Sequence, residues 1–308
     1  MSEIYPVLEQ LFLMAVLIAL GYYLNRSGKM NEGAEKGIAE LTIDIAFPAL
    51  IFTNIVKDFD LNMLKEYLIV PTAGLIVTLV SIGILLILAR LLNYGKREGE
   101  EFAFIAAFSN NIFIGAPICL ALFGSQGLIL AILYDFGMQI ILWTLGIWLL
   151  KDSSQNAESN FLANIFSPPV VGLLAGVALV LLNISVPDAV LNITGSIGNI
   201  TVPLAMIFIG LQLAKSSFKS IAGSRKIYII SALRLLVFPL LVYTVLGWFS
   251  LGPLLRGVMT LESAMPVFAS SSVIMGKYGH KSDLASEVIF ATIIFMIFTL
   301  PLFLYLTV

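Results

Sequence analysis

The sequence predicts an all-α integral membrane protein of ten transmembrane helices, built as two inverted five-helix repeats. Composition is the first observation: 59% of the 308 residues are hydrophobic and 12% are charged, whereas soluble proteins have about 25% charged residues. Length is the second, because ten spans of about 20 residues fit into this chain with short loops. The third is a pair of proline motifs that recurs after about half of the chain.

Ten apolar stretches are long enough to cross a bilayer. We expect the spans at residues 4–24, 33–56, 66–92, 101–123, 127–150, 160–182, 189–214, 225–250, 253–278 and 283–307. No Lys or Arg precedes the first stretch and no small-residue cleavage site closes it. It is therefore predicted to be a span and not a signal peptide.

Basic residues are concentrated in alternate loops. One set of loops holds Lys57, Lys65 and Arg256, and the opposite set holds Arg26, Lys29, Lys36, Arg90, Lys96, Arg97, Lys151, Lys215, Lys219, Arg225, Lys226, Lys277 and Lys281. The positive-inside rule places the richer set in the cytoplasm. We therefore expect a multi-pass protein of the cell membrane, in contact with its lipids, with both termini outside the cytoplasm.

The two halves of the chain resemble each other on either side of the polar stretch 151–160. Pro48 in the second span is matched by Pro203 in the seventh, 155 residues later, and Pro117 in the fourth is matched by Pro266 in the ninth, 149 residues later. Five spans per half is an odd number, so the halves have opposite orientations. Inverted repeats with helices broken at matching positions indicate a transporter with its binding site near the middle of the membrane.

The fourth span holds the first candidate site, Asn110 and Asn111 followed by Gly115 and Pro117. A proline inside a helix removes a backbone donor and clashes with the carbonyl four residues earlier, so we expect the helix to break at Pro117. The freed backbone groups need partners within the bilayer, either protein or solute. The two amides are candidates for binding a substrate carboxylate. The alternative is a structural kink held by bonds from asparagine to the backbone.

The ninth span holds the second candidate site. Glu262 precedes Pro266 by four residues, and an isolated carboxylate in the membrane must be protonated, paired or bound to a cation. Glu262, with Ser263 and Asn110, is the candidate site for Na⁺ or H⁺. Met265, Pro266 and Ser270 are assigned to the substrate site. The alternative is a structural ion pair between Glu262 and Arg234.

Further polar residues lie inside the predicted spans. Asp135 and Gln139 are four residues apart and therefore share one helical face; substrate binding and a structural role are both open for them. Arg234 in the eighth span is a candidate anion site or the charge partner of Asp135 or Glu262. For Asp44 in the second span we favour a structural or gating role.

Several functional classes find no support in the sequence. The chain has one His and one Cys, and it contains no metal-binding His–Glu–His helix and no glycine loop for phosphate. We expect no enzyme, no cofactor beyond a coupling Na⁺ or H⁺ and no other metal. Basic residues do not form a patch large enough for nucleic acid.

The proline motifs resemble those of the auxin efflux carrier family. The resemblance rests on Ser109-Asn110-Asn111 with Phe113 to Pro117, on Ala264-Met265-Pro266 with Lys277-Tyr278-Gly279, and on Phe47 to Phe52. It implies the fold shared by plant auxin carriers and bile acid sodium symporters. In that fold, helices 1, 2, 6 and 7 form a scaffold and often a homodimer interface, and helices 4 and 9 cross at the substrate.

The resemblance also implies a domain division and a role for two residues. The scaffold is expected at 1–60 and 160–215, and a mobile transport domain at 61–150 and 225–308. Asn110 matches the family's asparagine that meets a substrate carboxylate, and Glu262 matches the sodium-liganding glutamate of the bile acid symporters.

The function expected from these patterns is secondary transport of small organic anions, carboxylates such as malonate, malate or auxin-like acids, by an elevator-type mechanism. Two alternatives stay open, a membrane-embedded ligand sensor with the same fold and a sodium-coupled symporter of the bile acid type. A sensor needs an output surface, and the predicted loops are short.

Overall fold

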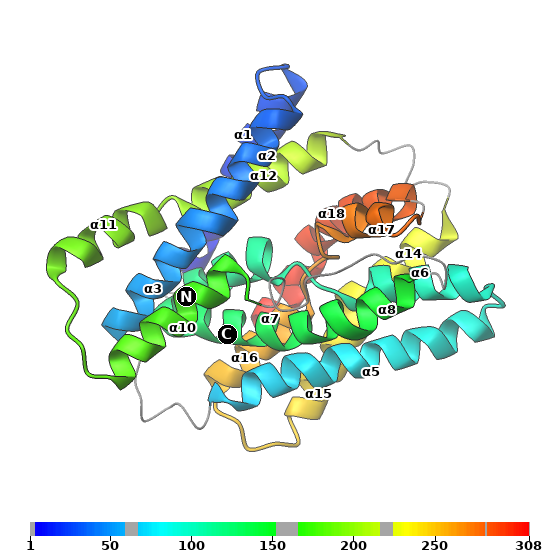
Figure 1. The fold of residues 1–308 in the computed structure, drawn as a ribbon. Helices are drawn as coiled ribbons and strands as arrows, with labels where there is room; N and C mark the ends of the chain where they lie inside the picture. The colour runs from blue at the N-terminus through cyan, green and yellow to red at the C-terminus, as the bar shows by residue number, and fades with distance from the viewer. Residues whose placement is uncertain (1–3, 59–66, 152–165, 216–223, 281, 308) are drawn as a thin grey trace. The chain divides into compact units, whose positions relative to one another are not determined.

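The computed structural model describes residues 4–58, 67–151, 166–215, 224–280 and 282–307 (Figure 1). Within these residues the chain is helical, and the β-structure consists of one isolated β-bridge. Nearly all of the polar stretch 151–160 lies outside the described residues, as do Lys65, Lys219 and Lys281.

The helices follow the predicted apolar stretches, and η marks segments with the wider π-type turn. The first half contains α1 (Ile4–Arg26), α2 (Glu32–Glu40), η1 (Leu41–Ala46), α3 (Phe47–Asp58), α5 (Ile69–Leu91), α6 (Lys96–Ala107), η3 (Asn111–Gly115), α7 (Ala116–Ile141), η4 (Leu142–Gly146) and α8 (Ile147–Leu150). The second half contains α10 (Pro168–Leu181), α11 (Asp188–Gly198), α12 (Thr201–Lys215), α14 (Arg225–Ala232), η5 (Leu233–Val237), α15 (Phe238–Leu246), α16 (Pro253–Ser263), α17 (Ser271–Lys277) and α18 (Ser282–Thr307).

Six helices in the described part of the chain are long and apolar enough to cross a membrane. They are Gly33–Asp58, Ile69–Leu91, Asn111–Leu150, Asp188–Ala214, Arg225–Leu246 and Asp283–Thr307. Two shorter apolar helices, Phe12–Arg26 and Pro168–Leu181, coincide with the first and sixth predicted spans. The chain is therefore an all-helical protein with several spanning helices, and its arrangement as ten spans in two inverted repeats stays a prediction.

The fourth and fifth predicted spans are separated at Gly124. This residue lies inside α7 but has φ +63° and ψ −155°, so the helix is interrupted there. A positive φ is strained for residues with a Cβ, and glycine adopts it at little cost. The kink falls in the gap between the predicted spans 101–123 and 127–150.

The chain divides into two compact units. Unit 1 consists of Met1–Leu64, Ala116–Ile132 and Phe166–Ser216. In it α1 packs along α12, and α3 packs on α10 and α11 (Figure 1). Gly21 and Gly210 lie so close to the backbones of Ile207 and Ile18 that neither has room for a Cβ. Such close approach through small residues is typical of helix packing in membranes.

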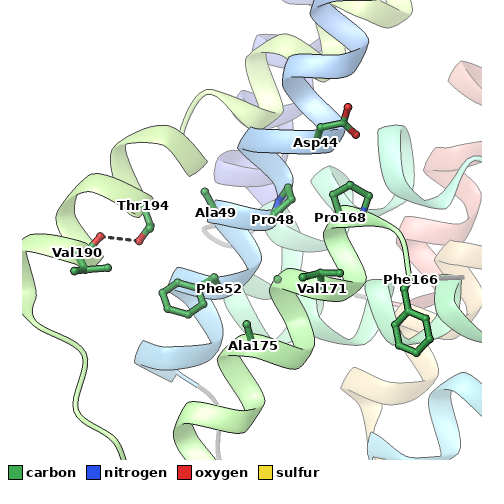
Figure 2. Close-up of a pocket in the computed structure, with 11 residues that line it drawn as sticks. Asp44, Pro48, Ala49, Phe52, Phe166, Pro168, Val171, Ala175, Val190 and Thr194 are labelled. Carbon is green, nitrogen blue, oxygen red and sulfur yellow. Dashed lines mark hydrogen bonds between the residues drawn. The ribbon is translucent and has the colours of Figure 1, made fainter. Parts of the chain in front are cut away.

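Unit 1 contains an open cavity of about 570 Å³ between η1, α3, α10 and α11 (Figure 2). Its lining is mostly apolar, with the carboxylate of Asp44 and the hydroxyl of Thr194 as polar groups. The residues of the predicted substrate site are absent from this described lining. The cavity is therefore distinct from the site predicted from the sequence.

Unit 2 consists of Lys65–Gly115, Leu133–Ile165 and Ser217–Val308. In it α18 packs against α14, α16 and α17, and α5 packs against α6. Lys226 at the start of α14 donates a hydrogen bond to Glu98 of α6. This bond lowers the pKa of the Glu98 carboxyl below its ordinary value.

His280 joins three elements of unit 2. Its Nδ1 lies 2.7 Å from Oε1 of Glu101 in α6, and its Nε2 lies 2.9 Å from the carbonyl oxygen of Leu150 at the end of α8. Arg97 of α6 donates to the Gly279 carbonyl at 2.7 Å. The short loop between α17 and α18 is thereby attached to α6 and α8.

Candidate functional site

The candidate site is a crossing of two broken helices within unit 2. Helix α6 ends at Ala107 and helix α16 ends at Ser263. The extended segments that follow them pair through an antiparallel bridge between Ser109 and Val267. The Asn110 N–H donates to the Pro266 carbonyl at 2.8 Å, and the Phe268 N–H donates to the Phe108 carbonyl at 2.9 Å. Backbone groups that each helix leaves unpaired thus find partners in the other.

The interruption of the first helix does not lie at Pro117, and that part of the prediction is wrong. The irregular residues are 108–110, and the helix resumes as η3 and continues directly into α7. Pro117 is the second residue of α7. The helical stretch that begins at Asn111 therefore runs through Pro117, where it lacks one backbone hydrogen bond. Pro266, in contrast, lies inside the interruption between α16 and α17.

Arg234 lies at the crossing, in the π-type segment η5 of unit 2. Its side chain is 3% exposed. Nε donates to the carbonyl of Met265 at 3.0 Å, Nη1 to that of Ala107 at 3.1 Å and Nη2 to that of Ser263 at 2.9 Å. The guanidinium therefore binds the C-terminal carbonyls of both half-helices.

Glu262 and Asn111 form a second buried contact at the crossing. Glu262 is fully buried and Asn111 is 1% exposed. With its amide nitrogen turned toward Glu262, Asn111 donates to Glu262 Oε2 at 3.0 Å, to the Glu262 carbonyl at 3.1 Å and to Ser109 Oγ at 2.8 Å. The opposite orientation would set the amide oxygen against these acceptors. Asn111 therefore connects the two broken helices through side chains.

Gly115 gives the Glu262 carboxyl the space it occupies. A Cβ built on Gly115 would lie 2.7 Å from the carboxyl carbon of Glu262. That distance is well inside van der Waals contact, so a larger residue would displace the carboxyl or the helix. The sequence places Gly115 in the candidate motif of the fourth span, and its contact with Glu262 was not predicted.

Asn110 differs from its neighbour. Its side chain is 1% exposed, and its Oδ1 has no hydrogen-bond partner within the described part of the chain. The hydroxyls of Thr260 and Ser271, which flank the second interruption, are buried and unpartnered in the same sense. Such groups each cost about 1–3 kcal/mol unless another molecule satisfies them.

The remaining predicted residues are placed around this core. Gln139 donates to Asp135 Oδ2 at 3.4 Å, and Trp143 donates to Gln139 Oε1 at 2.9 Å, so these three residues form a ladder along α7 and η4. Met138 of α7 places its sulfur 3.4 Å from the Ser109 hydroxyl. Ser270 precedes α17 and is half-buried.

Ser263 bonds within its own helix. Its hydroxyl donates to the Thr260 carbonyl at 2.6 Å. Its own carbonyl accepts from Arg234. The role of Arg234 as a ligand of carbonyls was missed in the sequence, although unpaired carbonyls at two helix C-termini call for a cation.

The fold and this crossing define a polytopic helical membrane protein with a buried polar site between broken helices. The profile of the family described as "Membrane transport protein" matches residues 6–160 and 157–304. The chain therefore belongs to this family of membrane transporters, the auxin efflux carrier-like proteins.

Relatives of this chain in archaea and fungi are also named as transporters. The chain is 31% identical over 298 residues to an "uncharacterized transporter" of Methanothermobacter thermautotrophicus, and the match covers 96% of each chain. It is 26% identical over 303 residues to one of Methanocaldococcus jannaschii, with 96% of this chain and 97% of the relative covered. A yeast relative from Saccharomyces cerevisiae is 22% identical over 174 residues, which are 50% of this chain and 41% of the relative.

Proposed function

We propose that this membrane transporter is a secondary carrier of small organic anions, carboxylates such as malonate, malate or auxin-like acids, and that it works by elevator-type alternating access. The observation that supports this most directly is the buried amide of Asn110, which is held by its backbone at the crossing while its Oδ1 lacks a partner within the described residues. The amide offers hydrogens to a carboxylate oxygen and an acceptor to a substrate hydroxyl.

The charge distribution at the crossing favours an anion near Asn110. Arg234 is positively charged and buried there. The long helix that resumes at Asn111 directs its first unpaired N–H groups, with the positive end of its dipole, toward the same interruption. Met265 and Pro266, which lie in the other interruption, complete the proposed substrate site together with Ser270, Asp135 and Gln139.

The membrane potential restricts the direction of transport. A monoanion entering against 100 mV, inside negative, costs about 2.3 kcal/mol, and a dianion costs about twice as much. Uptake therefore requires an inward anion gradient or a coupled cation, whereas efflux requires neither. Glu262 with Ser263 is the proposed site of a coupling cation, Na⁺ or H⁺. Transport that is indifferent to both sodium replacement and pH would remove this role.

The proposed assembly follows from the same resemblance. The carrier is proposed to be a homodimer in the cell membrane, with both termini outside the cytoplasm. It is joined through the scaffold helices of the first, second, sixth and seventh predicted spans, which correspond to α1, α2 to α3, α10, and α11 with α12. Membrane lipids and the organic anion are its proposed partners. A monomeric mass for the purified protein in lipid nanodiscs would contradict the dimer.

The Asn110→Ala variant tests the proposed substrate site. We expect carboxylate binding to weaken by roughly 10- to 100-fold, because a hydrogen bond to a charged group contributes about 1.5–3 kcal/mol. Melting temperature without ligand should change little, since the side-chain oxygen has no described protein partner. The measurement is a thermal-shift titration of purified protein with mono- and dicarboxylates, followed by uptake into proteoliposomes.

Asn192→Ala is the matched control, because Asn192 is exposed on α11. It should bind every carboxylate as the wild type does. Unchanged affinity in Asn110→Ala would restrict Asn110 to a structural role. Stabilisation by none of the carboxylates in wild-type protein would contradict the proposed substrate class.

A further inference from the structure

Arg234 brings together carbonyls from two helices that end at the crossing. Ala107 is the last residue of α6 and Ser263 is the last residue of α16, while Met265 lies in the interruption that follows. All three carbonyl oxygens are 2.9–3.1 Å from nitrogens of one guanidinium. A side chain on a third helical stretch, η5, therefore joins the two interruptions.

These carbonyls would otherwise attract a cation. The last carbonyls of a helix have no partner within the helix, and they carry the negative end of its dipole. In transporters with broken helices, such carbonyls coordinate Na⁺. The fully buried carboxyl of Glu262, the residue before Ser263, adds a potential negative charge beside them. The crossing has the oxygen-rich composition of a sodium site.

Guanidinium and sodium are mutually exclusive at these oxygens. All three carbonyl oxygens already accept hydrogen bonds from Arg234, and its charge repels a second cation in a medium of low dielectric constant. An arginine keeps its proton in proteins. The charge at this position is therefore permanent, whereas a bound ion would exchange with solvent.

We propose that Arg234 is a built-in cation that takes the place of a sodium ion at the crossing, and that its removal converts the carbonyl cluster into a site for Na⁺. The wild-type protein then needs no sodium to hold its crossing together, and a proton at Glu262 is the coupling ion that remains. This inference deepens the proposed coupling at Glu262, but it concerns ion binding alone and does not depend on the substrate.

The experiment compares full-length protein in equal concentrations of sodium chloride and choline chloride, without any substrate. In Arg234→Ala we expect a saturable rise of about 2–4 °C in melting temperature as sodium replaces choline, the shift for a cation at several times its dissociation constant. Wild type should show no such rise. Arg234→Lys, which keeps a charge and three donors, should resemble the wild type.

Arg256→Ala is the matched control for loss of an arginine. Arg256 of α16 also donates to a backbone carbonyl, that of Tyr243 at 3.2 Å, and lies over the Tyr243 ring. It makes these contacts with α15 and not with the broken ends. Its removal should lower the melting temperature equally in both salts. This separates a sodium site from general destabilisation.

Three outcomes would overturn the inference. Wild-type protein stabilised by sodium as strongly as Arg234→Ala would show that the arginine does not replace the ion. A folded Arg234→Ala without any sodium effect would show that the carbonyls do not bind it. An Arg234→Ala that is unfolded in both salts would make the guanidinium a clamp that no ion replaces. Folded Arg234→Ala protein that is recovered in sodium chloride but not in choline chloride would support the inference. None of these results bears on carboxylate binding, so the proposed substrate class is tested separately.

Discussion

Adjacent asparagines at the crossing have different surroundings, although the sequence presents them as a pair. Asn111 donates to the side chain and the backbone of Glu262, and Asn110 leaves its oxygen without a described partner. One amide thus contributes to the structure of the crossing, and the other is available to a ligand. That both are buried was predictable, because polar groups in lipid are costly. Which of them meets Glu262 depends on the register of two chain segments, which no local pattern encodes.

The Gly115→Ala variant tests the contact with Glu262. An added Cβ would lie 2.7 Å from the carboxyl carbon of Glu262, so we expect the free energy of unfolding to fall by about 1–3 kcal/mol through overpacking. The measurement is the melting temperature of the purified protein. Gly83→Ala is the control: it lies in α5 with nothing within 4 Å of an added Cβ. It should gain up to about 1 kcal/mol from helix propensity.

Equal stability of Gly115→Ala and Gly83→Ala would mean that the Glu262 carboxyl does not occupy the place described.

The carbonyl partners of Arg234 could not be predicted from the sequence. Its position inside an eighth span was predicted to be unusual, and a carboxylate or an anion was the expected partner. The structure gives it three carbonyl partners, and the charge of Glu262 also acts on it. The carbonyls were not predicted, because helix ends become visible only when the positions of the interruptions are known.

At the scale of elements, proline position alone did not locate both interruptions. Pro266 lies within its break, but Pro117 lies inside the continuous helical stretch of η3 and α7, which begins after the irregular residues 108–110. A helix can run through a proline with the loss of one backbone hydrogen bond, so the residue type alone does not distinguish the two positions. A second irregularity, the kink at Gly124 inside α7, was not predicted, although it falls between the predicted spans 101–123 and 127–150.

The contacts of His280 predict that its ring stabilises unit 2. Its Nδ1 lies within hydrogen-bond distance of the Glu101 carboxylate, and its Nε2 lies within hydrogen-bond distance of the Leu150 carbonyl. Arg97 is the other charged group here, 3.7 Å from the same Glu101. Because His280→Ala removes both contacts of the ring, we expect it to lower the free energy of unfolding by about 1–3 kcal/mol.

The melting temperature of the purified protein measures this contribution. It should fall by a few degrees in His280→Ala relative to the wild type. Lys36→Ala serves as control, because the Lys36–Glu40 pair of α2 is exposed and such pairs contribute about 0–1 kcal/mol. A melting temperature of His280→Ala equal to that of Lys36→Ala would show that the ring does not hold the loop between α17 and α18 to α6 and α8.

At the scale of the whole molecule, the helix pairs of unit 1 are reciprocal. The first predicted span of one half, α1, packs along the second span of the other half, α12; α10 and α3 repeat this pairing with the halves exchanged. Two repeats related by a twofold axis give this pattern. The pattern agrees with an internal repeat, and the opposite orientation of the two halves stays a prediction. The sequence could suggest the repeat from its proline motifs, whereas the contacts that pair the halves come from glycines such as Gly21 and Gly172.

An elevator mechanism requires that each unit moves as one body, and this can be tested inside unit 1. Thr53 of α3 and Thr194 of α11 have their hydroxyl oxygens 2.7 Å apart, which is compatible with the Cβ separation of a disulfide. We expect Thr53→Cys with Thr194→Cys, in a Cys119→Ala background, to form a disulfide on oxidation. Because both residues belong to the same unit, the crosslinked carrier should transport at nearly the rate of the reduced one.

The Cys119→Ala variant without the cysteine pair, oxidised in the same way, controls for damage by the oxidant. A crosslink that stops transport, and whose reduction restores it, would mean that α3 and α11 separate during the cycle. Alternating access would then involve movement within unit 1, and the proposed scaffold, which includes both α3 and α11, would not be rigid.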